Sequence, residues 1–320
     1  MKKLLALFIV ILFSSACQDN NVSLGSKLIE VELIGDLAER TLEASGLTWY
    51  KDNLIILPQF PHKWDDLFDG AIYFIPKKRI ENYINGENSN PIKGEKIQFI
   101  ADGLDEIGKS SGSGYEAITF VGDNVYVSIE SISDAIGSSY IVKGKIDFEN
   151  RKLVLDASTK FEIKSQTGIN NMGEETIFQF NSYIYAIHEA NGLNVNKNPY
   201  ATKLDEKLMT SEKIPIPNID LRLTDATDVD STGKFYVINY YYPGEFNKLK
   251  PNLEKDSKAI EQILELQITD NKIVQIDKSI IELTNIKEEN GHNWEGIVRF
   301  NNGFLLVTDM FPKTILAYYK

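Results

Sequence analysis

The stretch GYEAITFVGDNVYVSIE (114–130) contains two runs of alternating apolar residues on either side of the polar turn GDN. Alternation with a period of two around such a turn is typical of a β-hairpin. Two glutamates, Glu116 and Glu130, bracket this hairpin. Because a hairpin brings the chain back to the height at which it started, the pattern predicts that the two carboxylates lie side by side.

The same pattern of strand, polar turn and second strand recurs along the chain. The five hairpins are predicted at 45–59, 116–130, 174–189, 227–241 and 295–309. A third strand follows each of them, at 71–76, 139–147, 200–205, 262–270 and 314–320. A fourth strand follows the first four units, at 96–101, 152–157, 212–217 and 272–277. The fifth unit has no fourth strand of its own, and residues 27–35 form a spare strand upstream of the first unit.

Repeated four-stranded units, with a missing strand supplied from the other end of the chain, predict an all-β fold of the β-propeller type. The N-terminal strand would pair with the last blade and cover its exposed edge. The number of units favours five blades. Six is the alternative, since the intervals 45–116 and 227–295 are long enough to contain another blade. No low-complexity linker interrupts residues 27–320, so we expect them to form one domain.

Residues 1–16 have the pattern of a secretory signal peptide, with two lysines, an apolar run at 4–13 and small residues before Cys17. The apolar run is shorter than the roughly 20 residues that a membrane-spanning helix needs. Ser14-Ser15-Ala16-Cys17 resembles the lipobox of bacterial lipoproteins, in which the cysteine is lipidated and becomes the mature N-terminus. Since Cys17 is the only cysteine, we expect a lipid anchor. A free cysteine after ordinary signal cleavage is the alternative.

The segment 17–26 is polar and is expected to tether the anchor to the fold. Gln18 follows the cysteine, where aspartate is associated with inner-membrane retention, so the resemblance implies an exported protein at the outer membrane or cell surface. Removing residues 1–16, with their two lysines and no acid, changes the formal charge from −12 to −14. Such an acidic surface argues against nucleic-acid binding and against membrane contact beyond the anchor. We expect a monomer.

The predicted binding face is the one that carries the long loops. In a propeller the loops before the inner strand and after the second strand open on the same face. Here these loops are long, at 59–70, 103–115, 164–174 and 240–258, whereas the turns on the opposite face contain only a few residues. Long loops on a rigid scaffold are where binding residues concentrate, so we expect the site at this mouth of the central channel.

Aligning the five units places acids at the mouth in three of them. The paired positions are Glu116/Glu130, Glu175/Glu189 and Glu295/Asp309, while the other two units carry Ser45/Gln59 and Thr227/Tyr241. Six carboxylates around one narrow opening would repel one another unless cations neutralised them. Ca²⁺, which takes 6–8 oxygen ligands, is the predicted cofactor. The alternative is a water-filled polar channel with hydrogen-bonded acids.

A rim of polar and aromatic residues is predicted around these acids. It consists of Gln59, Trp64, Tyr240, Tyr241, His292 and Asn293. Aromatic rings at this place would stack on a sugar or aryl ligand, and packing against neighbouring blades is the alternative. Arg222 would hold an anion beside the metal or, alternatively, form salt bridges with the acids.

The unit starts resemble those of two bacterial envelope families. The motifs are Ser45-Gly46-Leu47, Glu116-Ala117-Ile118, Glu175-Thr176-Ile177 and Glu295-Gly296-Ile297, with LLVTD at 305–309. They are similar to the SdiA-regulated propeller family and to the family called "esterase-like activity of phytase". The resemblance implies a calcium-associated, exported and often lipid-anchored propeller. The fourth unit departs from the pattern, because Thr227-Asp228-Val229 stands where the families have E-G-[IL].

Three functions follow from these observations. The first is a metal-binding propeller that presents its mouth to a small molecule, glycan or envelope protein. The second is a metal-dependent hydrolase of a phosphoester, ester or lactone, with Glu116 or Glu295 as general base. The third is a structural role in an envelope assembly. The sequence has no obvious nucleophile and no Cys/His cluster, so binding is favoured over catalysis.

Overall fold

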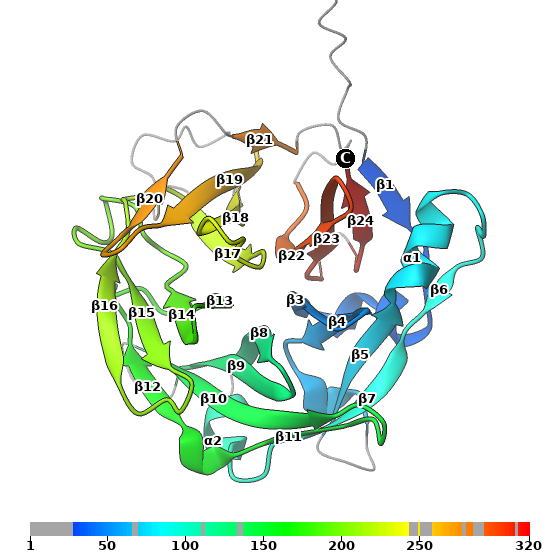
Figure 1. Cartoon of the computed structure of the whole chain (residues 1–320), viewed down its shortest axis with the longest axis horizontal. Helices are drawn as coiled ribbons and strands as arrows, with labels where there is room; N and C mark the ends of the chain where they lie inside the picture. Colours follow the sequence, from blue (N-terminus) through cyan, green and yellow to red (C-terminus); the bar gives the residue numbers. More distant parts are fainter. Residues whose placement is uncertain are drawn as a thin grey trace, which may run out of the picture.

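The computed structural model of the chain describes residues 28–65, 70–109, 113–132, 137–242, 249, 258–276, 280–283, 291–310 and 313–320. Cys17, the predicted signal peptide and the predicted tether lie outside these residues. The described strands radiate from a central axis in four-stranded groups (Figure 1). The predicted all-β propeller is therefore confirmed. None of the helices in the described ranges is long and apolar enough to cross a membrane.

Each group, here called a blade, begins with a strand next to the axis and continues outward. Blade 1 contains β3 (Ala44–Tyr50), β4 (Asn53–Pro58), β5 (Ala71–Pro76) and β7 (Glu95–Ile100). Blade 2 contains β8 (Gly114–Val121), β9 (Asn124–Ser131), β10 (Ser138–Asp147) and β11 (Lys152–Leu155), and β12 (Phe161–Lys164) pairs with β10. Blade 3 contains β13 (Thr176–Phe180), β14 (Tyr183–Ile187), β15 (Tyr200–Asp205) and β16 (Ser211–Pro215).

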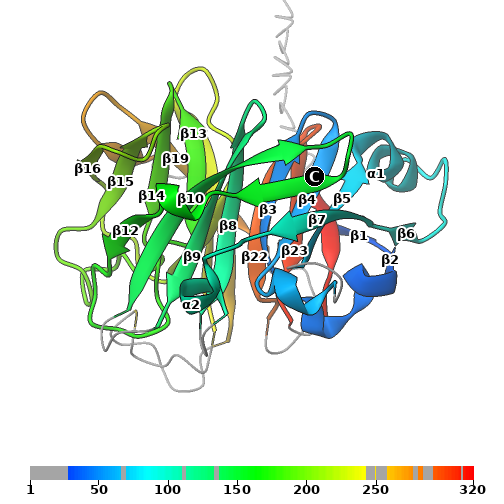
Figure 2. The same ribbon diagram turned by 90° about the horizontal axis from the view of Figure 1, so that it is seen from below.

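Blade 4 contains β17 (Arg222–Ala226), β18 (Lys234–Tyr241), β19 (Ile260–Ile268) and β20 (Ile273–Gln275), and β21 (Ile281–Glu282) pairs with β19. Blade 5 contains β22 (Trp294–Phe300), β23 (Gly303–Thr308), β24 (Leu316–Tyr319) and β1 (Leu28–Val31). Outside the blades, β2 (Leu33–Ile34) pairs with β6 (Ile92–Lys93), next to α1 (Lys77–Ile84), and α2 (Asp105–Gly108) precedes β8. Figure 2 shows that β3, β8 and β22 run along the axis of the ring.

The ring closes through the N-terminal strand. β1 pairs antiparallel with β24, in a register that runs from Leu28 opposite Tyr319 to Val31 opposite Leu316 (Figure 1). Lys313 adds an ion pair to Glu30, with 2.7 Å between Nζ and Oε1. The predicted closure is thus confirmed, and the strand that covers the last blade is the one found upstream of the first unit.

Blades 1 and 2 are joined more tightly than the sequence predicts. Their outermost strands, β7 and β11, pair in parallel, with Lys152 opposite Gln98 and Val154 opposite Ile100. Eight strands of the two blades and β12 therefore belong to one nine-stranded sheet. Neither outer strand carries a sequence signal for this pairing.

Side chains from both faces of each blade pack on the neighbouring blades. On β9, Val125, Val127 and Ile129 face blade 1, whereas Tyr126 between them faces blade 3. Similar apolar clusters fill the contacts between the other neighbouring blades. Because successive strand residues point to opposite faces, a strand that is apolar on both faces suits this arrangement.

The inner strand of blade 4 begins earlier than predicted. The predicted strand started at Thr227, but β17 covers Arg222–Ala226 and pairs Arg222 with Tyr240. Thr227 follows the strand, and Asp228 lies toward the opposite face, where its carbonyl accepts a hydrogen bond from Arg299 at 3.4 Å. The sequence alignment of the fourth unit was therefore wrong by five residues.

Candidate functional site

The acidic side chains of the inner strands occupy β-bulges. The pairing of β8 with β9 skips Glu116, and the pairing of β22 with β23 skips Glu295. Ser45 occupies the same position in β3. A bulge inserts one unpaired residue and redirects its side chain. In this way the same local irregularity in three blades turns a side chain toward the mouth of the channel.

Small residues follow the bulges because the inner strands approach one another closely. A Cβ added at Gly296 would lie 3.0 Å from the backbone nitrogen of Leu47, and one added at Gly46 would lie 3.3 Å from the Cα of Ala117. Both contacts are tighter than ordinary van der Waals contact, so side chains larger than hydrogen would push the blades apart. The S-G and E-G motifs at the unit starts thus have a packing reason that is independent of ligand binding.

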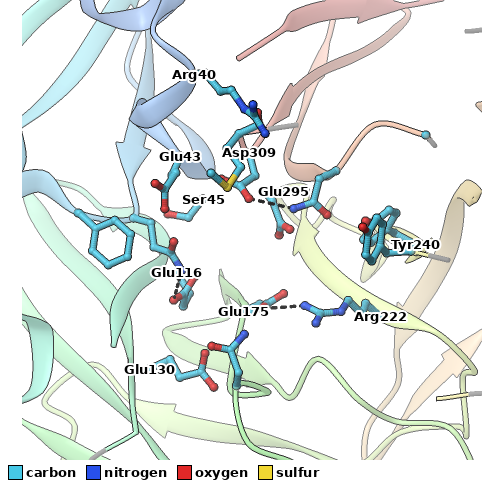
Figure 3. A pocket seen from close by; sticks show the side chains of 17 residues that line it. Arg40, Glu43, Ser45, Glu116, Glu130, Glu175, Arg222, Tyr240, Glu295 and Asp309 are labelled. Atoms are coloured by element: carbon cyan, nitrogen blue, oxygen red, sulfur yellow. Dashed lines mark hydrogen bonds and ion pairs between the residues drawn. The ribbon is translucent and has the colours of Figure 1, made fainter. Parts of the chain in front are cut away.

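The bulges open into a cavity of about 440 Å³ at the mouth (Figure 3). Six carboxyl side chains line it, namely Glu43, Glu116, Glu130, Glu175, Glu295 and Asp309. Its other lining residues are Arg40, Ser45, Gln59, Phe60, Asn171, Arg222, Tyr240, Tyr242, Gly291, Asn293 and Met310. Five of the six acids predicted from the sequence are therefore brought together at one opening.

The sixth predicted acid, Glu189, does not line the cavity. It is fully buried, with 0% of its surface exposed, and forms an ion pair with Arg222. The same guanidinium lies 3.8 Å from Oε1 of Glu175. Leu221, directly before Arg222, has a φ of 73°, which is an unfavourable conformation for a bulky residue. Blade 4 thus supplies a cation to the ring of acids, and salt bridging was the correct alternative for Arg222.

Two amide side chains of the predicted rim hold carboxylates in place. Asn293 Nδ2 donates a hydrogen bond to Asp309 Oδ2 at 3.0 Å, and Gln59 Nε2 donates one to Glu116 Oε1 at 3.1 Å (Figure 3). Tyr240 also lines the cavity. Three of the six predicted rim residues therefore lie where the sequence placed them.

The other three rim residues, Trp64, Tyr241 and His292, are not among those that line the cavity. Trp64 packs edge-on against Tyr73, with ring centroids 6.4 Å apart, within the apolar cluster between blades 1 and 5. Tyr241 is fully buried. His292 is 2% exposed and stacks on Trp294 at a centroid distance of 5.2 Å. Trp64 and Tyr241 therefore pack inside the protein, which was the alternative prediction for the rim aromatics. His292 is packed in the same way.

Burial and mutual repulsion raise the pKa values of five cavity acids, Glu116, Glu130, Glu175, Glu295 and Asp309. Burial is the main cause for each of them, and neighbouring carboxylates add to it. The pKa is raised to about 7 for Glu116 and to about 9 for Glu130. The pKa of Glu295 is raised well above its usual value. The pKa of Asp309 is raised only to about 6, because the hydrogen bond from Asn293 favours the charged form of this carboxyl group.

Two cavity residues adopt left-handed backbone conformations. Glu43 has a φ of 50° and Asn171 a φ of 59°. Such conformations cost energy and cluster at functional sites, where the surrounding structure enforces them. Glu43 precedes the first unit start by two residues, and the alignment of unit starts missed it for that reason.

A buried carboxylate below the cavity ties three inner strands together. Oδ2 of Asp225 accepts hydrogen bonds from the backbone nitrogens of Ile297 at 2.9 Å and Leu47 at 3.4 Å. Its Oδ1 accepts one from Ala226 at 2.8 Å. Asp225 lies in the irregular part of β17, so blade 4 uses its bulge to brace β3 and β22. No pattern in the sequence singles out Asp225.

The predicted calcium ion finds suitable donor atoms here but no grouped ligands. The cavity offers carboxylate and amide oxygens, the donors that calcium prefers. In the described part of the chain, however, no three His, Cys, Asp or Glu side chains are arranged to hold one ion. The acids surround the opening as separate groups rather than as a coordination shell. Calcium binding stays a prediction.

Comparisons with known proteins identify the fold. No family model and no curated protein matches the sequence. Among solved structures, an exo-β-1,3-galactanase from Phanerochaete chrysosporium with β-1,3-galactotriose is similar, with a TM-score of 0.54 and 8% identity over 92% of this chain and 64% of that chain. This chain thus spans less than two thirds of the galactanase chain. At such low identity the similarity shows the fold alone.

Two arabinanases are similar at a lower level. An α-L-arabinanase from Cellvibrio cellulosa has a TM-score of 0.49 and 9% identity, over 91% of this chain and 92% of that chain. An arabinanase from Bacillus subtilis has a TM-score of 0.47 and 9% identity, over 91% and 97% of the two chains.

Proposed function

We propose that this propeller binds the end of a glycan in the acid-lined cavity and hydrolyses a glycosidic bond there. The observation that carries the proposal is a cavity in which buried carboxyl groups have different environments. Asp309, whose pKa is about 6, is ionised near neutral pH, while burial and neighbouring carboxylates raise the pKa of Glu295 well above its usual value and favour its protonated form. A protonated acid beside an ionised carboxylate is the pair that glycoside hydrolysis requires.

The chemistry assigns a role to each of these two groups. Glu295 would donate its proton to the glycosidic oxygen as the bond to the anomeric carbon breaks. Asp309 would stabilise the positive charge that develops on the sugar ring, or take a proton from the attacking water. Tyr240 and Phe60 line the cavity and would contact the sugar, and Gln59 offers an amide for its hydroxyls. The similar fold of a galactanase crystallised with its oligosaccharide supports this choice of substrate class.

A substrate panel tests the proposal. The purified protein is incubated with aryl glycosides and oligosaccharides of several sugars, and the release of phenol or reducing sugar is measured. We expect turnover of at least one glycoside. Model phosphoesters, esters and lactones belong in the same panel, with and without calcium, because a hydrolase of these substrates is the alternative from the sequence. Turnover of those substrates alone would replace the present proposal.

We also propose that the propeller is exported and anchored through a lipid on Cys17, as its surrounding sequence predicts. In Cys17→Ser the acceptor of the lipid is lost, so the full-length protein is expected to leave the detergent phase for the aqueous phase. Intact mass of the mature N-terminus is the direct measurement. A mature wild-type protein without an acyl mass at Cys17 would refute the anchor.

A further inference from the structure

The cavity is lined by more acidic than basic side chains. Six carboxyl groups line it, against the two guanidinium groups of Arg40 and Arg222. Arg222 is shared with the fully buried Glu189 below the cavity, and Arg40 donates through Nε to the carbonyl of Met310 at 2.9 Å. The ring therefore holds several carboxyl groups that can ionise beside a cation that enters the mouth.

One of these carboxyl groups points into the cavity with an unsatisfied oxygen. Glu175 is 7% exposed and lines the cavity (Figure 3). Its Oε1 faces Arg222 at 3.8 Å, whereas its Oε2 has no hydrogen-bond partner among the described residues. A buried carboxylate oxygen without a donor is costly, and a bound group that supplies a donor relieves that cost.

We propose that the cavity takes an amino sugar, a glycan end that carries a free protonated amine, and that Glu175 accepts a hydrogen bond from this ammonium group. The inference rests on the proposed function and names its substrate class. An ammonium group carries three donors and one positive charge, so it satisfies two or three separate carboxylates at once. A metal ion needs its ligands grouped within one shell, and the described residues contain no such group.

The lining of the cavity fits the rest of such a ligand. The amides of Gln59, Asn171 and Asn293 suit hydroxyl groups, and Tyr240 and Phe60 add apolar surface to the lining. The volume of about 440 Å³ lies within the range of small-molecule sites, which is roughly 300–1,000 Å³. A uronic acid, in contrast, would bring a further negative charge to the ring.

Binding of a cation should also release protons. The pKa values of Glu116 and Glu130 are raised to about 7 and about 9, first by burial and then by neighbouring carboxylates. A positive charge beside such groups lowers their pKa. At pH 6.5 a bound ammonium group is therefore expected to displace protons from the ring, whereas a neutral sugar displaces none.

Isothermal titration with matched trisaccharides tests the inference. The ligands are a glucosamine trimer, its N-acetylated form, a neutral glucose trimer and a uronic acid trimer. We expect the glucosamine trimer to bind about 10- to 100-fold more tightly than the other three, the range of one charge-assisted hydrogen bond. Titration in buffers of different ionisation enthalpy measures the released proton, and this measurement needs no variant protein.

Glu175→Gln tests the assigned carboxylate. The preference for the glucosamine trimer over the glucose trimer is expected to fall about tenfold or more. Glu87→Gln, an exposed acid after α1, is the matched control and should keep the preference. Equal or tighter binding of the neutral trimer would overturn the amino-sugar inference while leaving the proposed function intact. Calcium that raises the melting temperature and blocks the glucosamine trimer would assign the ring to the metal instead. If no trimer binds and no glycoside is hydrolysed, the proposed function itself fails.

Discussion

Replacing Glu295 by glutamine is expected to lower kcat/KM for an oligosaccharide by about 10³-fold, within the usual range for loss of a general acid. Glutamine keeps the shape of the side chain in its bulge but has no acidic proton for the glycosidic oxygen. The loss should appear in kcat rather than KM, because proton donation matters in the transition state and not in the bound ground state. Initial rates at several substrate concentrations measure it.

The leaving group distinguishes the acid from its partner. A dinitrophenyl glycoside departs without protonation, so Glu295→Gln should recover most of its rate on that substrate, whereas Asp309→Asn should remain slow on both. Glu87→Gln is again the control. Equal rates of Glu295→Gln and wild type on the oligosaccharide would exclude Glu295 as the acid.

The pH profile of the wild type follows from the same pair. Asp309 gains a proton as the pH falls through about 6, so the rate should drop on that side. Glu295 has its pKa raised well above the usual value, and the rate should drop again once the pH passes it. The expected profile is a bell whose acid limb lies near pH 6. Asp309→Asn should lose that limb in whatever activity remains.

Val31→Asp in the closing strand is expected to lower the free energy of unfolding by about 3–5 kcal/mol, because it removes a buried side chain and buries a charge. Val31 is 1% exposed and pairs with Leu316, in the apolar cluster between blades 1 and 5. Without a firm β1, the edge of β24 is free to pair with another chain. Urea unfolding measures the loss, and light scattering measures the resulting association.

A neighbouring substitution in the same strand provides the control. Glu30→Gln removes the exposed ion pair with Lys313 and should change the free energy of unfolding by less than about 0.5 kcal/mol. If Val31→Asp unfolds at the same urea concentration as Glu30→Gln, closure by β1 contributes little to stability.

The sequence was sufficient to predict most of the fold because each hairpin carries its own signal. Alternation around a polar turn, as in GDN between β8 and β9, is visible in any single unit. Blade 4 lacked this clarity. Its inner strand, Arg222–Ala226, is short, polar and interrupted by Thr224 and Asp225, which bond to blade 5 and to the backbone of β3 and β22. The polar residues of this strand bond to neighbouring blades, so the strand lacks the alternation of apolar and polar residues by which a strand is recognised in a sequence.

The spacing of the acids predicted where most of the site residues lie. The prediction was wrong for residues whose contact partner belongs to another unit. Glu189 has the same spacing as Glu130, yet it is buried because Arg222 from the next blade covers it. His292 precedes an inner strand, yet Trp294 and Glu261 hold it inside, 3.6 Å separating its Nδ1 from Oε1 of Glu261. Contacts between units decide these cases, and the periodicity of one unit does not contain them.

The shared sheet of blades 1 and 2 has a mechanical consequence. Backbone hydrogen bonds between β7 and β11 make these two blades a single stiff arc, so any widening of the ring falls on the remaining junctions. Glu116 and Glu130 belong to blade 2, in this shared sheet, while Glu295 and Asp309 belong to blade 5, which β1 completes. A ligand that contacts both acid pairs would draw blades 1 and 2 toward blade 5. A bound ligand would therefore stabilise the ring where β1 closes it.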